Sequence, residues 1–119
     1  MPVFRDRVKD TTTSTGTGAV TLSGTAPSGY QAFSTAYPAL GTPFLYCIAG
    51  GAQWETGAGY LSTATTMVRS EVMDGSSGIN VPVSFSAGSK EVFVTITAHW
   101  VEDADSGATL HKIRGMAMP

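Results

Sequence analysis

The sequence predicts an all-β fold, either an antiparallel β-sandwich or a small barrel of about seven or eight short strands with extended N- and C-terminal arms. Apolar and polar residues alternate in several short runs, and clusters of Gly, Ser, Asp and Pro separate these runs. No window of about a dozen residues repeats apolar side chains at helical spacing without an intervening Gly or Pro. The 119 residues suit one domain, which we expect to span residues 1–119.

The clearest strand is expected at residues 91–101, where Val92 and Val94 fall on one face. Residues 81–85 alternate in the same way. The short segment 87–89 between the two runs contains a glycine, so we expect it to join them as a hairpin.

A third alternating run covers residues 66–73. Regular alternation would place Arg69 and Glu71 together on one exposed face, as is common in antiparallel sheets with one solvated side. Further strands are expected at residues 3–9, 20–23, 44–49 and 53–61.

Residues 30–43 are rich in alanine and are interrupted by Pro38. They can form either a helical turn or a loop that packs Tyr30, Phe33 and Tyr37 onto the sheet.

Both ends of the chain are expected to differ from the central body. Residues 1–18 combine a strand with a Thr/Ser/Gly arm, and residues 102–119 form an acidic turn followed by a tail. Threonine favours extended backbone, and glycine allows close approach of another chain. We therefore expect either end to pair with the sheet edge of a neighbouring subunit by β-addition.

The composition argues against several classes of partner. Charged residues make up only 13% of the chain and the net charge is −2, whereas nucleic-acid and membrane surfaces call for a basic face. No apolar run approaches the roughly 20 residues needed to cross a bilayer. We expect a protein synthesised in a cytoplasm that binds neither nucleic acid nor membrane.

No segment predicts a cofactor or metal site. The glycines at Gly16 and Gly18 are followed by no helix, as a phosphate loop would require. His99 and His111 have no further ligands at metal-binding spacing, and residues 103–107 lack the distal glutamate of a calcium loop. The single cysteine, Cys47, is expected to be a reduced core residue.

Catalytic residues are likewise not predicted. The chain has no GxSxG elbow, and a hydrolase would need His99 or His111 beside a carboxylate and a nucleophile. Glu55 could pair with Glu71 or Asp74 as in glycosidases. However, its place after Trp54 in a strand suggests that it faces solvent or a sheet neighbour. We expect a protein that is not an enzyme.

Three aromatic residues support an alternative function. Tyr46, Trp54 and Tyr60 could form an exposed platform on which sugar rings stack, as in carbohydrate-binding modules that recognise a host surface. Aromatic residues at strand positions also serve as core or interface anchors, so both interpretations stay open.

An ordered series of short segments runs through most of the chain. These segments are residues 6–13 (DRVKDTTT), 15–18 (TGTG), Leu22, Gly24, 29–33 (GYQAF), 46–48 (YCI), 54–60 (WETGAGY), 69–72 (RSEV), 76–78 (SSG) and 85–95 (FSAGSKEVFVT). The series resembles a small domain of tailed-bacteriophage structural proteins, found both free-standing and as the anchor region of fibre-type proteins. The resemblance covers roughly residues 5–97, and the chain from Ala98 onward lies outside it.

The resemblance implies a virion component without catalytic activity, on the outside of the particle. It would act as head decoration or as a module that anchors a tail fibre or spike. We expect a homo-oligomer, with a trimer as the favoured state, in contact with capsid or tail proteins. The candidate contact residues lie in the two ends of the chain: Arg5, Arg7, Thr11, Thr12, Thr13, Thr15, Lys112, Arg114, Met116 and Met118.

Overall fold

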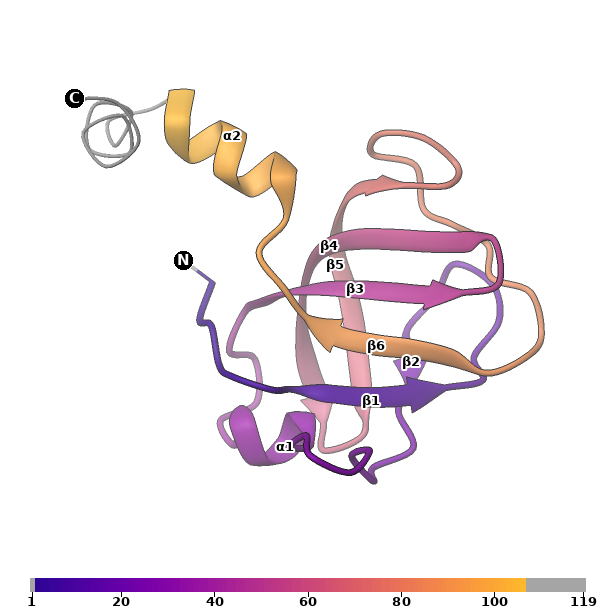
Figure 1. Ribbon diagram of the computed structural model, residues 1–119, viewed down its shortest axis with the longest axis vertical. Helices are drawn as coiled ribbons and strands as arrows, with labels where there is room; N and C mark the ends of the chain where they lie inside the picture. Colours follow the sequence, from indigo (N-terminus) through magenta and orange to yellow (C-terminus); the bar gives the residue numbers. More distant parts are fainter. Residues whose placement is uncertain (1, 107–119) are drawn as a thin grey trace.

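The computed structural model describes residues 2–106 and confirms the all-β, antiparallel prediction (Figure 1). It contains six strands and two short helices. In chain order these are β1 (Lys9–Thr12), β2 (Val20–Thr21), α1 (Phe33–Ala36), β3 (Phe44–Gly50), β4 (Gln53–Thr63), β5 (Thr66–Gly75), β6 (Lys90–Val94) and α2 (Ala98–Ser106).

The six strands form one sheet that curls into a nearly closed barrel. Their order is β1-β6-β3-β4-β5-β2, and every neighbouring pair is antiparallel. The two edge strands approach each other, because Thr12 forms a bridge with Leu22 and the Ser23 N–H donates to Thr11 O at 3.0 Å. The structure therefore takes the barrel form of the two architectures that the sequence allows.

Alternation along the strands fills the barrel. On β3, the side chains of Phe44, Tyr46 and Ile48 are completely buried. On β6, Val92 is also fully buried, so one face of each strand lines a common core.

One turn of helix, α1, covers part of this core. Phe33 and Tyr37 pack against Phe44, with ring centroids 5.3 and 4.7 Å apart. The Tyr37 hydroxyl donates to Val3 O at 2.7 Å, which brings the first residues of the chain against the helix. Residues 30–43 thus adopt the helical-turn alternative, and two of their three aromatic side chains enter the core.

The expected strand at 91–101 ends at Val94, earlier than its alternation suggests. Thr97 is the cause, because its Oγ1 accepts the Trp100 N–H at 3.1 Å and so caps the N-terminus of α2. His99, expected within a strand, therefore lies on a helix.

Residues 81–85 do not form a regular strand, and the hairpin expected at 87–89 is absent there. Pro82 cannot donate a ladder hydrogen bond. The Val83 N–H and carbonyl bind side chains inside the barrel instead, and Phe85 forms a single bridge with Gly16.

Candidate functional site

A buried polar cluster lies inside the barrel. The Glu55 carboxylate is fully buried and forms a two-point ion pair with Arg69, in which Nε donates to Oε2 at 2.7 Å and Nη2 donates to Oε1. The Tyr46 hydroxyl also donates to Oε2 at 2.7 Å, and the Val83 N–H donates to Oε1 at 2.9 Å. Each oxygen of the buried carboxylate thus has hydrogen-bond donors, which offsets the cost of removing the charge from water.

Arg69 connects this cluster to two distant segments. Its Nη1 donates to the carbonyls of Gly16 and Gly18, each at 3.2 Å, and Nη2 donates to Val83 O at 2.8 Å. Gly16 and Phe85 also exchange backbone hydrogen bonds. The Thr/Gly segment that the sequence presents as a free arm is therefore bonded to its own barrel.

The protonation states of Tyr46 and Arg69 favour a structural role for the buried cluster over a role in proton transfer. Burial, reinforced by the Glu55 charge, raises the pKa of Tyr46 above its usual range. Burial alone would lower the pKa of Arg69, but the bond to Glu55 and its charge raise it overall. Tyr46 therefore remains a neutral donor and Arg69 a cation. Among the described residues, every buried side-chain nitrogen and oxygen has a hydrogen-bond partner.

Of the two positions expected for Glu55, the structure shows the second, because its carboxylate bonds to Arg69 and Tyr46 on the two neighbouring strands. The prediction for Arg69 was wrong. Arg69 does not share an exposed face with Glu71, which is exposed while the Arg69 side chain is only 3% exposed. The reason is a bulge, because Gly59 pairs with Arg69 while the preceding Ala58 pairs with Glu71. The extra residue, Ser70, places Arg69 inside the barrel and Glu71 outside.

This bulge also separates the carboxylates that could have formed a glycosidase pair. Glu55 contacts Arg69 inside the barrel, whereas Glu71 lies on the exterior and Asp74 is half-buried. Asp74 Oδ1 accepts the Gly75 N–H at 2.8 Å.

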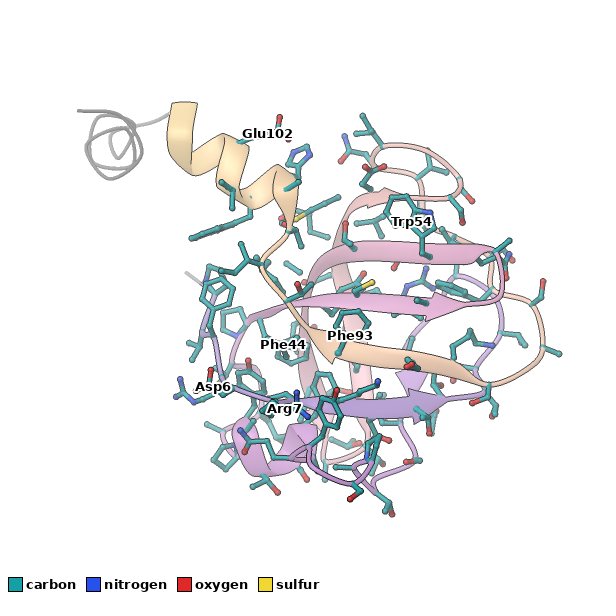
Figure 2. The ribbon with its side chains drawn as sticks, viewed as in Figure 1. Asp6, Arg7, Phe44, Trp54, Phe93 and Glu102 are labelled. Atoms are coloured by element: carbon teal, nitrogen blue, oxygen red, sulfur yellow. The ribbon has the colours of Figure 1, made fainter. Side chains whose placement is uncertain are left out.

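The aromatic platform is not assembled as one surface. Tyr46 is 0% exposed and points into the barrel, whereas Trp54 is 41% exposed on β4 (Figure 2). Tyr60 is half-buried on the same strand, where it pairs with Val68. A sugar could therefore stack on Trp54 but not on Tyr46.

The candidate contact residues in the N-terminal segment are divided between interior and surface. Thr12 is buried and donates to Thr21 O at 2.6 Å, and Thr11 is half-buried. The remaining four are exposed: Arg5, Arg7, Thr13 and Thr15. Lys112, Arg114, Met116 and Met118 lie outside the described residues, as does His111. The acidic turn expected from residue 102 is not found, because α2 continues to Ser106.

Sequence reasoning missed two further buried charged residues. Asp10 accepts hydrogen bonds from the Ser23 hydroxyl and from the Gly24 N–H at 3.0 Å, which joins β1 to the segment after β2. Lys90 donates to Ser86 O and Gly88 O, each at 2.7 Å. A charged residue at an inward-facing position of an alternating run is the signal that could have found both.

The outer surface carries a groove of about 510 Å³ where β1, β6 and the segment before α1 meet. It is lined by Arg7, Val8, Lys9, Tyr30, Glu91, Phe93 and Val94. The Arg7 guanidinium carbon lies 3.9 Å from the centroid of the Tyr30 ring, and Lys9 forms an ion pair with Glu91 at 2.8 Å.

Residues 2–106 offer little support for a metal site, a membrane-spanning helix or a reactive thiol. That range contains no group of three or more His, Cys, Asp or Glu that could hold a metal ion. It also contains no helix long and apolar enough to span a membrane. Cys47 is half-buried, and burial raises the pKa of its thiol to about 11, so the reactive thiolate is scarce at neutral pH.

Comparison with family models, with curated proteins and with solved structures finds no match to this chain.

Proposed function

We propose that the protein is a non-enzymatic structural component of a tailed-bacteriophage virion, on the exterior of the particle. It would decorate the head or anchor a tail fibre or spike. The resemblance of the segments within residues 5–97 supports this proposal. The low proportion of charged residues also supports it, since such a surface favours close contact with another protein over charge repulsion.

The observation that carries the proposal is the position of α2. This helix projects away from the barrel (Figure 1). One apolar residue within the helix and one in the linker before it are exposed. Ile96 is 59% exposed and Val101 is 39% exposed. A helix of nine residues is marginal in water unless an apolar side is packed. A neighbouring subunit is the partner that would supply this packing.

The base of the helix is fixed to the body. The Thr97 hydroxyl contacts Met73 Sδ at 3.2 Å in a buried site, and the Trp100 ring meets the Phe4 ring edge-on at 5.4 Å between centroids. An attached partner would therefore be positioned relative to the whole barrel. We propose that α2 contacts a second copy of the chain, in a trimer, or the capsid or tail protein on which the copies sit.

The test places one charge on this helix and one on the linker before it, and compares them with a charge at an equally exposed apolar residue elsewhere. In Ile96→Asp combined with Val101→Asp, we expect loss of self-association in light scattering and of binding to virus particles that lack the protein. Leu40→Asp is the control, because Leu40 is also 59% exposed but lies in the connection between α1 and β3.

The proposal fails if the unaltered chain is a monodisperse monomer that does not bind such particles. It also fails if Leu40→Asp has the same effect as the double variant, since the loss would then reflect added charge alone.

A further inference from the structure

The groove between β1 and β6 contains surface side chains that neither the core nor α2 uses. Figure 2 shows Arg7 at the approach to β1 and Phe93 on β6, and both line this groove. Its volume of about 510 Å³ lies within the range of small-molecule sites.

Arg7 is held in a fixed arrangement at one side of the groove. Its backbone has φ of 57°, a left-handed conformation that is uncommon for residues other than glycine. Its Nε donates to Gly29 O at 3.2 Å, and its guanidinium stacks on Tyr30. Within residues 2–106, its two Nη groups form no hydrogen bond, so a preorganised two-pronged donor remains for a ligand. Such backbone strain is often found at ligand-binding positions.

The remaining lining residues add different chemistry. Lys9 lies 4.9 Å from the Tyr30 ring and pairs with Glu91, which is itself 48% exposed and can accept further hydrogen bonds. Phe93 pairs with Lys9 in the β1–β6 register and is half-buried, so part of its ring is accessible. The groove thus combines an excess positive charge, a partly exposed carboxylate that can accept a further hydrogen bond, and an aromatic surface.

We propose that this groove binds an anionic pyranose, meaning a sugar ring that carries a carboxylate or a phosphate. The anionic group would pair with the Nη groups of Arg7, as guanidinium does with carboxylate or phosphate. The apolar face of the ring would pack on Phe93, and a ring hydroxyl would donate to Glu91. A simple anion would contact only Arg7, and a neutral sugar would contact only Phe93 and Glu91. This inference goes beyond the proposed structural role and does not depend on it.

The test is a titration of the full-length chain, followed by backbone amide chemical shifts. The probes are glucuronate, glucose 6-phosphate, glucose, acetate and inorganic phosphate. We expect one or both anionic sugars to shift the amides of Arg7, Lys9, Tyr30 and Phe93 saturably, with much weaker effects from the other three probes. The tighter of the two sugars identifies the anionic group.

The proposal is overturned if neither anionic sugar shifts these amides. It is overturned equally if acetate or phosphate binds as tightly, since the groove would then be a plain anion site or one for acidic peptides. Tight binding of glucose, which carries no anionic group, would show that pairing with Arg7 does not determine the affinity.

A pair of variants tests Arg7 directly. Arg7→Gly removes the guanidinium and relieves the left-handed backbone, so the barrel should remain folded. We expect it to weaken the anionic sugar by about tenfold or more. Arg5→Gly makes the same charge change at an exposed residue outside the groove and should leave affinity within about twofold. Unchanged affinity in a folded Arg7→Gly chain would refute the proposal, and the titration of the unaltered chain stands if the variant does not fold.

Discussion

At the scale of single residues, Glu55 and Arg69 are the most consequential pair in the barrel. A buried ion pair is costly unless hydrogen bonds satisfy both partners, and removing one partner leaves an uncompensated charge. Here the Tyr46 hydroxyl and the Val83 N–H donate further hydrogen bonds to the Glu55 carboxylate, and three backbone carbonyls accept hydrogen bonds from the Arg69 guanidinium. The pair therefore joins segments more than fifty residues apart in sequence.

Glu55→Gln should lower the free energy of unfolding by about 3–5 kcal/mol, because Arg69 would remain buried without a counter-charge. Arg69→Met should cost a similar amount, and the double variant should cost less than the sum of the two. Urea unfolding monitored by circular dichroism measures all three.

The matched control is Glu91→Gln, which breaks the exposed pair with Lys9 and should have little effect on stability. Strict additivity of Glu55→Gln and Arg69→Met would show that the buried pair contributes no coupling.

At the scale of elements, the glycines of β4 explain how a large tyrosine fits inside a small barrel. Gly57 pairs with Tyr46 across the β3–β4 ladder, and both residues face inward. A Cβ added at Gly57 would meet Glu71 O and would lie 2.7 Å from the Tyr46 hydroxyl. A Cβ added at Gly59 would lie 3.3 Å from the Tyr46 ring. The alternating glycines in WETGAGY therefore make room for the hydroxyl that reaches Glu55.

Gly57→Ala should lower the free energy of unfolding by about 1–3 kcal/mol, because the backbone and the tyrosine must both move to accept the methyl group. Gly18→Ala is the control, since no atom lies within 4 Å of a Cβ built there. Thermal unfolding of the two variants makes the comparison. Equal stability of the two would contradict the close packing of β4 against Tyr46.

At the scale of the whole molecule, the N-terminal segment closes the barrel. Asp10 and Thr12 bind the residues after and within β2, and Gly16 pairs with Phe85. Residues 9–18 are thus integrated into the body, whereas α2 is the described element that projects from it.

Amide hydrogen exchange should show this integration. The Gly16 and Phe85 amides bond to each other's carbonyls at 2.9 and 3.2 Å, so we expect them to exchange only on global unfolding. Their exchange should be at least about a hundredfold slower than that of Gly51 and Ala52 in the exposed β3–β4 turn. Comparable rates would mean that the segment opens independently, as a true arm would. In Arg69→Met, protection of Gly16 should fall because Gly16 O loses one of its two donors, Arg69 Nη1, and keeps only the Phe85 N–H.

Local pattern was sufficient for the fold class and for most strands. The strand expected at residues 3–9 was misplaced, because residues 6–7 form a turn and β1 covers Lys9–Thr12 instead. β3 and β4 begin where their alternation begins, because a period of two and Gly-rich turns depend only on neighbouring residues. The strand expected at residues 81–85 did not form because Pro82 has no N–H to donate, and the side chains of Glu55 and Arg69 bind the Val83 backbone groups. The strand expected at 91–101 was shortened by a cap at Thr97, which alternation does not reveal.

The sequence by itself determined an antiparallel β domain of low charge, since periodicity and composition are properties of the chain alone. Only the tertiary structure decided that Arg69 and Glu71 face opposite sides of the sheet, because a bulge at Ser70 shifts the β4–β5 register between them. It likewise decided that the Thr/Gly segment bonds to its own barrel and that Arg7, Tyr30 and Phe93 share a groove. Those contacts join residues distant in sequence, and their register depends on pairing that no local pattern encodes.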